Sequence, residues 1–293
     1  MRKYTMTKPS LAEIQHQVSL SLKEDLGIPV NAELSAANDI TANLIDESTQ
    51  AKATIITREA CTICGIDWVE QAFFLVEPSI ALQWCVKDGD SVAADTVLVT
   101  LSGSARGILT AERTALNFLQ TLSATATVTA QYANILTNTN TKILDTRKTI
   151  PGMRFAQKYA VLCGGGTNHR IGLFDAFLIK ENHIFACGSI QKAIGKAKQQ
   201  HPGKPIEVEV ENIDEFKQAH SAGADIVMLD NFTNEQIAEA VTVNQHKCKL
   251  EVSGNVTAER LQELAKLGVD YISSGALTKH IQAIDLSLRI SMN

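Results

Sequence analysis

The sequence predicts an α/β protein in which a smaller N-terminal α+β domain precedes an open or incomplete, seven-stranded α/β barrel. Two observations lead to this fold class. After residue 112, short apolar runs alternate with amphipathic stretches of helical length, and polar or charged residues follow each run. This alternation is typical of parallel strands joined by crossover helices. Because six clear strands are fewer than the eight of a closed barrel, a doubly wound sheet is the second interpretation.

The composition limits the class of protein. The chain has 293 residues, of which 45% are apolar, and its formal net charge is −5. This length is enough for one large domain, or a large and a small one, with a sizeable core. The negative charge argues against a nucleic-acid binder. No apolar run approaches the ~18 residues of a membrane span, so we expect no membrane partner.

The cysteines and the N-terminus indicate a cytoplasmic protein. Six cysteines are scattered along the chain, which is typical of reduced thiols. Cys61 and Cys64 form one CxxC motif without a matching pair, so we interpret them as buried thiols rather than as a metal or redox site. The basic N-terminus has no apolar run behind it and does not resemble a secretory signal.

The small domain is predicted at residues 1–113. Helical patterns at 11–27 and 65–76 flank strand-like segments, and turn-forming residues such as those at 87–90 interrupt these segments. We expect the C-terminal segment 281–293 to join this domain. The strand-like segments are 51–65, 80–92 and 96–109.

The barrel is predicted at residues 114–280. A long helical pattern at 111–139 leads into it, and the alternation of strands and helices follows. The six predicted strands are 142–146, 176–180, 206–210, 225–230, 249–253 and 270–274. The predicted helices between them are 189–201, 213–223, 234–245 and 258–268.

Polar side chains stand at the carboxyl end of every predicted strand. In parallel α/β folds these ends meet at one face, where binding and catalytic sites lie. One such residue would carry no information, but six groups in succession predict a functional site. The groups are Asp145–Lys148, Lys180, Glu209 with Glu211, Asp230–Asn231, Ser253–Asn255 and Ser274–Gly275.

Charges are sorted by sign along the barrel sequence. Within 147–180 every charged residue except Asp175 is basic, and within 206–236 every charged residue except Lys217 is acidic. The strand-end charges predict a site that is basic on one side and acidic on the other, which suits an anionic substrate beside a metal-bound polyphosphate. Helix surfaces explain some of the remaining charges: Arg154, Lys158, Asp214 and Glu215.

Three glycines, 164–166, precede His169 and Arg170 in the segment GGGTNHR. This is not a phosphate-binding Walker loop, because the Gly-Lys-Ser/Thr ending is missing. One interpretation is a helix C-cap followed by a loop. The other is that the glycines allow a close backbone approach that presses the two cationic side chains against a ligand. The planar fork of an arginine matches a carboxylate.

The segment DTRKTIPGMRFAQKYAVLCGGGTNHRIGLFDAFLIKENH, residues 145–183, resembles the central signature of the quinolinate phosphoribosyltransferases. The family is also called nicotinate-nucleotide pyrophosphorylase (carboxylating). The resemblance continues through ERTALNFLQ, IEVEVEN, ADIVMLDNF, EVSGNV and SSGALTKH, and so covers most of the chain after residue 110. The segments KEDLG and DIT near the N-terminus add weaker support.

The resemblance implies an activity, a cofactor and an assembly. The family joins the ring nitrogen of quinolinate to C1 of phosphoribosyl pyrophosphate, releases pyrophosphate and CO2, and forms nicotinate mononucleotide for NAD biosynthesis. It requires Mg²⁺ and no organic cofactor. It works as a homodimer with a shared active site, to which the neighbouring subunit supplies the counterpart of Arg113.

The resemblance also implies roles for individual residues. The cationic pocket for the two carboxylates would contain Arg113, Arg147, Lys148, His169, Arg170 and Lys180. The metal and ribose side would contain Glu209 and Asp230, with the metal held indirectly through substrate phosphates. The 5′-phosphate would lie near Ser253, Gly254, Asn255, Gly275 and Lys279. The catalytic residues would be Lys148, Lys180, Glu209 and Asp230.

Three positions are left open. Ala124 stands where the family pattern has glycine, and this could shift a loop beside Arg113. Either Lys279 or His280 could approach the phosphate. A buried Glu207 would need a cationic partner that the sequence does not name.

Three other functions compete with this interpretation. A barrel aldolase would use Lys180 as a Schiff-base lysine, because it ends a strand. A related phosphoribosyltransferase would act on nicotinate or another ring with a thinner cationic pocket. A phosphate-binding module would bind a ligand without turnover. The density of cations disfavours the last two.

Overall fold

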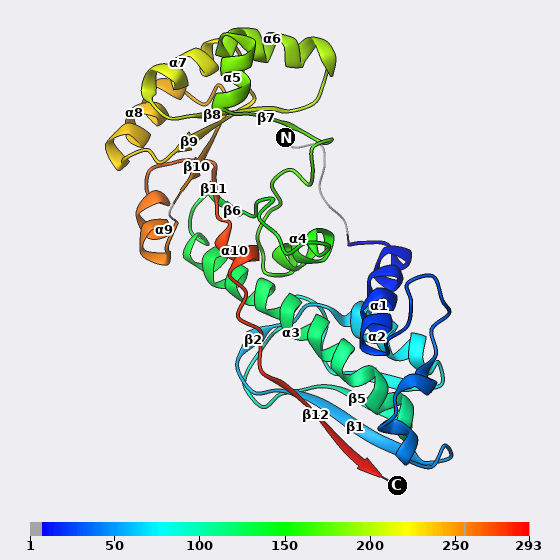
Figure 1. Ribbon diagram of the computed structural model, residues 1–293. Coiled ribbons are helices and arrows are strands. Elements are labelled where there is room, and N and C mark those ends of the chain that lie inside the picture. Colours follow the sequence, from blue (N-terminus) through cyan, green and yellow to red (C-terminus); the bar gives the residue numbers. More distant parts are fainter. Residues whose placement is uncertain (1–7, 255, 293) are drawn as a thin grey trace. The chain divides into compact units, whose positions relative to one another are not determined.

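The computed structural model describes residues 8–254 and 256–292. The chain forms two compact units. The N-terminal unit contains the described residues up to 128, together with 155–164 and those from 281 onward, and the barrel unit contains 129–154 and 165–280. Helix α3 (Ala105–Ile135) includes the boundary predicted at residue 113, and its residues are divided between the two units (Figure 1).

The N-terminal unit is built on a four-stranded antiparallel sheet in the order β12-β1-β5-β3. The central strand β1 pairs on one side with β12, from the C-terminal segment, so that Ile55 lies opposite Leu288. The strands are β1 (Gln50–Thr57), β3 (Ala81–Trp84), β5 (Val97–Ser104) and β12 (Leu286–Met292). A separate two-stranded pair consists of β2 (Cys61–Thr62) and β4 (Ser91–Val92).

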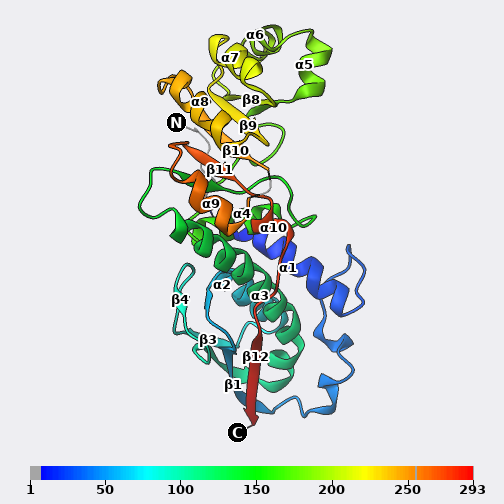
Figure 2. The same cartoon turned by 90° about the vertical axis from the view of Figure 1, so that its left-hand side faces the viewer.

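Helices α1 (Leu11–Asp25) and α2 (Ile66–Val76) pack against each other in this unit (Figure 2). Ser10 begins α1 with a capping box: its side chain accepts the N–H of Glu13, and the Glu13 carboxylate accepts the N–H of Ser10. The indole of Trp68 on α2 donates to Gln17 of α1 at 2.7 Å. Two short 3₁₀ helices, η1 (Ala36–Asn38) and η2 (Ala42–Leu44), follow α1.

The barrel unit contains a six-stranded parallel sheet in the order β6-β11-β10-β9-β8-β7. Each strand lies within or beside a run predicted from the sequence. The edge strands β6 and β7 do not pair with each other, so the barrel is open, as expected. The strands are β6 (Lys142–Leu144), β7 (Phe177–Ile179), β8 (Ile206–Val210), β9 (Ile226–Asp230), β10 (Lys249–Ser253) and β11 (Tyr271–Ser273).

A seventh strand is represented among the described residues only by an isolated bridge. Thr167 pairs in parallel with Leu144 on the free side of β6, because the other side of β6 is occupied by β11. The Thr167 N–H donates to Ile143, and the Asp145 N–H donates to Thr167. The glycine-rich segment therefore occupies the edge at which a further strand would close the barrel.

Helices connect the parallel strands and cover the outer face of the sheet (Figure 1). They bury apolar faces against strands that are themselves buried, as in β9, where all residues but the last are buried. The helices are α5 (Glu181–Cys187), α6 (Ile190–Gln200), α7 (Ile213–Ser221), α8 (Asn234–Asn244), α9 (Ala258–Leu264) and α10 (Ala276–Lys279).

Helix α4 (Arg154–Cys163) lies almost wholly in the N-terminal unit, although its sequence lies inside the predicted barrel. Its buried residues include Lys158, which is 0% exposed. The prediction that Lys158 lies on an exposed helix surface was wrong. Helix α4 is buried over more of its circumference than the single apolar stripe in its sequence indicates. Across the described residues, no helix combines the length and apolarity needed to span a membrane.

Candidate active site

The carboxyl ends of four barrel strands border a pocket of about 810 Å³. Strands β9, β10 and β11 contribute their last residues or those just after them, and the segment after β6 contributes two more. All of the lining residues belong to the barrel unit. The predicted site residues in this lining are Lys148, Asp230, Ser253, Gly254, Gly275 and Lys279.

Both candidates for a phosphate contact, Lys279 and His280, line the pocket, so the structure does not favour one over the other. Lys279 ends the short helix α10, and His280 is its C-cap residue. Asn255 lies outside the described residues. The lining also contains polar residues to which no role was given in advance: Tyr132, Thr146, Thr257 and Ser273.

Position 254 requires glycine because its backbone lies very close to Asn231, another residue for which no individual role was predicted. The backbone of Gly254 has φ +99°, and a Cβ added there would lie 2.3 Å from Oδ1 of Asn231. Asn231 itself adopts a positive φ of 55° and donates to Asp230 at 3.0 Å. The ends of β9 and β10 are thus fitted closely together, and only glycine fits at position 254.

The segment GGGTNHR is a helix C-cap followed by a loop, as in the first of the two interpretations, and the contact of its cations with a ligand stays a prediction. It begins as a helix C-cap, because the Gly164 N–H closes the last turn of α4 and Gly165 is left-handed, with φ +79°. It continues as a loop held by Asp145, a fully buried residue just after β6. The Asp145 carboxylate accepts the side chain of Asn168 at 2.6 Å and the N–H of His169 at 2.8 Å.

Asp175, the single acid of the basic segment, fixes the far side of the same loop. Its carboxylate accepts the N–H groups of Ile171 at 2.7 Å and Gly172 at 2.9 Å, and its side chain is buried. Two buried carboxylates therefore hold the backbone on both sides of Arg170. This fixes the direction in which the guanidinium leaves the loop.

His169 is the cationic partner that buried Glu207 needed. Its Nε2 lies 3.2 Å from Glu207 and 3.4 Å from Glu251, and all three side chains are at most 5% exposed. The resemblance places His169 in the cationic pocket for the substrate carboxylates, and this role stays a prediction. In the structure the ring joins the loop to strands β8 and β10.

The protonation of His169 is subject to two opposing contacts. Burial alone lowers the pKa of the ring, but the Glu207 and Glu251 carboxylates outweigh burial and raise that pKa to about 10. Against this, Nδ1 accepts the N–H of Arg170 at 2.7 Å, which requires an unprotonated Nδ1. A small ring rotation releases that local contact, whereas the carboxylates are fixed by burial. We therefore expect an imidazolium.

The pH dependence of His169 follows from this pKa. Because the pKa is about 10 in the folded protein and ~6.5 in an unfolded chain, the ring stabilises the fold fully below pH ~6.5. This stabilisation is lost as the pH rises towards about 10. In NMR spectra of ¹³C-labelled histidine, we expect His169 to stay protonated at pH 8. The signal that disappears in His169→Asn is the signal of His169, and titration of that signal near pH ~6.5 would contradict the raised pKa.

Arg147 and Arg170 form a pair of like charges. The pKa of Arg170 is lowered, first by burial and then by the positive charge of Arg147. The Nε of Arg147 is buried and has no hydrogen-bond partner among the described residues. Two guanidiniums that influence each other's charge, one with an unused donor, are chemically suited to an anion with more than one charge.

Acidic residues stand on the neighbouring strand ends. The pKa of Asp230 is raised, first by burial and then by the charge of Glu209 on the adjacent strand β8. Glu209 is paired with Lys180 at 2.5 Å. The predicted division into a basic and an acidic side therefore has a structural counterpart, with Lys180 linking the two.

Arg113 and Ala124 both lie in helix α3 and in the N-terminal unit. Arg113 is exposed, and Ala124 is buried at 5% exposure. The expectation that Ala124 shifts a loop beside Arg113 was wrong, because both positions are helical. The role of Arg113 in a neighbouring subunit stays a prediction.

The fold and the site define a class: an open α/β barrel with a pocket at the carboxyl ends of its strands. The sequence matches the family described as "Quinolinate phosphoribosyl transferase, C-terminal domain" over residues 125–289. It matches "Quinolinate phosphoribosyl transferase, N-terminal domain" over residues 39–123. The chain belongs to the quinolinate phosphoribosyltransferase family.

Similar proteins and solved structures agree with this membership. A probable nicotinate-nucleotide pyrophosphorylase [carboxylating] of Bacillus subtilis is 37% identical over 256 residues, which cover 87% of this chain and 89% of that protein. A protein of the same description from Methanocaldococcus jannaschii is 41% identical over 263 residues, covering 86% and 91%. The structure of the nicotinate-nucleotide pyrophosphorylase from Francisella tularensis superposes with a TM-score of 0.93 at 49% identity, covering 99% and 100%.

Proposed function

We propose that this chain transfers phosphoribosyl from phosphoribosyl pyrophosphate to quinolinate, with loss of CO2, to form nicotinate mononucleotide. The observation that carries the proposal is the presence of two partly buried arginines, Arg147 and Arg170, since the buried Nε of Arg147 has no hydrogen-bond partner among the described residues. Quinolinate is a dianion whose two carboxylates stand on neighbouring ring carbons. Two guanidinium forks at fixed positions match it better than a single cation.

The pocket at the strand ends is suited to the phosphoribosyl group. Its lining offers two cationic side chains, Lys148 and Lys279, together with the hydroxyls of Ser253 and Ser274. Gly254 and Gly275 line the same pocket, where their backbone can lie beside phosphate oxygens. The carboxylate of Asp230 lines the same pocket and would face the ribose.

The chemistry follows from charge development at the ribosyl carbon. As pyrophosphate departs, C1 becomes cation-like, and the carboxylates of Asp230 and Glu209 stabilise it. The cations Lys148 and Lys180 hold the anionic ring so that its nitrogen faces C1. After the nitrogen is ribosylated, the positively charged ring accepts the electron pair released with CO2. The reaction therefore needs no organic cofactor.

The acidic residues are suited to Mg²⁺ bound mainly through substrate phosphates. Burial and, after it, the charge of Glu209 raise the pKa of Asp230, and a nearby cation would offset the repulsion between the two carboxylates. Mg²⁺ takes few protein carboxylates and shares oxygens with phosphates, so Asp230 and Glu209 are a sufficient set. When bound, the ion neutralises charge on the departing pyrophosphate.

The proposal includes a homodimer that works in the cytoplasm. Arg113 is exposed on α3, in the N-terminal unit rather than in the unit that holds the pocket. A two-fold dimer would place the Arg113 of each subunit at the pocket of the other.

Lys180 gives no support to an aldolase mechanism. It forms an ion pair with Glu209 at 2.5 Å, whereas a Schiff base requires the neutral amine. The alternative with a similar fold is a phosphoribosyltransferase for another ring. Incubation with phosphoribosyl pyrophosphate and either quinolinate or nicotinate distinguishes the two, with products identified by mass spectrometry. We expect nicotinate mononucleotide from quinolinate only, and product from nicotinate would support the alternative.

Replacing either Arg147 or Arg170 by lysine should selectively weaken quinolinate binding. For Arg147→Lys or Arg170→Lys we expect a loss of about 1–3 kcal/mol, because lysine cannot reproduce a planar two-donor contact. Calorimetric titration should show phosphoribosyl pyrophosphate binding nearly unchanged. Arg58→Lys, in an exposed ion pair with Asp95, is the matched control. If the binding of quinolinate and of phosphoribosyl pyrophosphate weakens equally, the two arginines lie elsewhere in the site.

A further inference from the structure

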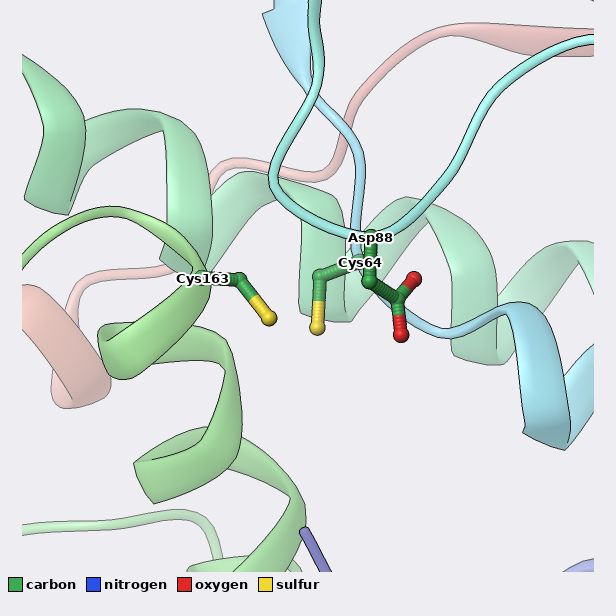
Figure 3. Close-up of side chains that lie close together, drawn as sticks. All are labelled: Cys64, Asp88 and Cys163. Atoms are coloured by element: carbon green, nitrogen blue, oxygen red, sulfur yellow. The ribbon is translucent and has the colours of Figure 1, made fainter.

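Three side chains of the N-terminal unit that have no part in the proposed reaction lie close together. Sγ of Cys64, Sγ of Cys163 and a carboxylate oxygen of Asp88 all lie within 4.8 Å of one another (Figure 3). Cys64 lies just before α2, Asp88 lies in the turn between β3 and β4, and Cys163 is the last residue of α4. Figure 3 shows the two sulfur atoms turned towards each other. Cys64 therefore finds its partner in Cys163 rather than in Cys61 of the CxxC motif.

The carboxylate of Asp88 is already used by the fold. One oxygen accepts the N–H groups of Gly65 at 2.9 Å and Ile66 at 3.2 Å, at the N-terminus of α2. The other accepts the hydroxyl of Tyr159 at 2.9 Å. A metal ion would have to displace these bonds and would find only three ligands. The chemistry left to the cluster is between the two sulfurs.

The two thiols differ in a way that suits stepwise oxidation. Cys64 is 0% exposed, and burial raises the pKa of its thiol well above the usual range. A hydrogen bond from Cys64 is the main influence on Cys163 and lowers the pKa of the Cys163 thiol, although burial opposes it. Cys163 is also partly exposed. An accessible sulfur with thiolate character beside a buried thiol is the arrangement of an attacking and a resolving cysteine.

We propose that Cys163 and Cys64 form a dithiol site that reacts with hydroperoxides. The Cys163 thiolate attacks one oxygen of hydrogen peroxide, the O–O bond breaks, and the products are a sulfenic acid and hydroxide. The Cys64 sulfur then attacks the sulfenic sulfur and displaces hydroxide, and the two hydroxides leave as water with the two thiol protons. The sulfurs lose two electrons in total, the peroxide gains them, and the product is a Cys64–Cys163 disulfide.

The position of Cys163 allows the sulfurs to come together. A disulfide requires a separation of about 2.05 Å, so the end of α4 must move towards Cys64. Three glycines, 164–166, follow Cys163 directly, and Gly165 is already left-handed. They can absorb this movement with little resistance.

The test uses the reduced, full-length protein and a small excess of hydrogen peroxide. After alkylation of the remaining thiols, peptide mapping by mass spectrometry should show a Cys64–Cys163 cross-link that dithiothreitol reverses. The more exposed Cys85 serves as the internal control. We expect oxidation of Cys163 at least about tenfold faster than that of Cys85, because the thiolate is the reactive form.

Two variants separate the steps. In Cys64→Ser, Cys163 should stop at a sulfenic acid that dimedone traps, and in Cys163→Ser, Cys64 should stay reduced. The Cys85→Ser variant should form the cross-link normally. A wild-type protein that keeps both thiols alkylatable after peroxide, or in which Cys85 reacts as fast as Cys163, would overturn the proposal. One equivalent of zinc in the untreated protein that is lost in Cys64→Ser would also overturn it.

Discussion

Arg113→Ala and Lys148→Ala should each be nearly inactive, and a reassembled mixture of the two should recover about a quarter of the wild-type activity. Each homodimer lacks a cation in both of its sites. In a mixed dimer, one site lacks both residues and the other is whole, provided that Arg113 serves the neighbouring subunit. Random pairing makes about half of the dimers mixed, which leaves about a quarter of all sites intact. Initial rates of product formation after reassembly measure the recovery.

A second mixture is the matched control for this experiment. Lys148 and Asp230 line the same pocket of one barrel unit, so no mixed dimer of Lys148→Ala with Asp230→Asn has a whole site. That mixture should stay inactive. If the Arg113→Ala mixture also stays inactive although mixed dimers are shown to form, Arg113 acts within its own chain and the shared site is excluded.

Asp230→Asn should reduce turnover by about 10²-fold or more while quinolinate binding stays near normal. The asparagine keeps the shape of the side chain but removes the charge that would face the cation-like ribosyl carbon. The same change should raise the Mg²⁺ concentration needed for half-maximal rate, because one of two carboxylates near the ion is neutral. Steady-state rates over a Mg²⁺ titration, with quinolinate binding measured by calorimetry, give both quantities.

The control for Asp230→Asn is Glu239→Gln, which removes an exposed carboxylate of the barrel unit. Glu239 forms a surface ion pair with Lys217, and such pairs contribute little to stability. Turnover and metal dependence should match those of the wild type. Full turnover with unchanged metal dependence in Asp230→Asn would remove Asp230 from the site.

The barrel strands could be predicted because burial on both faces leaves a continuous apolar run. The run IVMLD of β9 is buried up to its last residue, and the polar residue that ends it marks the edge of the sheet. Because the carboxyl ends of parallel strands meet at one edge of the sheet, Asp230, Ser253 and Gly275 could be grouped together before any contact was known. The site residues on strand ends were therefore accessible from local pattern alone.

Pairings between distant segments could not be predicted in this way. The contact of His169 with Glu207 and Glu251 joins a loop to two strands, and only the sheet order makes them neighbours. The approach of Cys163 to Cys64 likewise depends on α4 lying in the N-terminal unit, against the order of the sequence. One sign was present: a buried Glu207 would need a cationic partner, but the sequence did not identify His169 as that partner.

The individual roles of uncharged residues were the other gap. Asn231 and Thr146 belong to the predicted strand-end groups and line the pocket, but neither residue type carries a charge that indicates a particular role. The position of Asn231 against Gly254 explains why glycine stands there, and this contact is visible only in three dimensions.

The release of labelled CO2 from quinolinate tests the proposed activity most directly. Quinolinate carrying ¹⁴C in the carboxyl group next to the ring nitrogen is incubated with the protein and Mg²⁺, with and without phosphoribosyl pyrophosphate. We expect labelled CO2 only when phosphoribosyl pyrophosphate is present, in an amount equal to the nicotinate mononucleotide formed. Release of CO2 without phosphoribosyl pyrophosphate, or a nucleotide product that keeps the label, would contradict coupled transfer and decarboxylation.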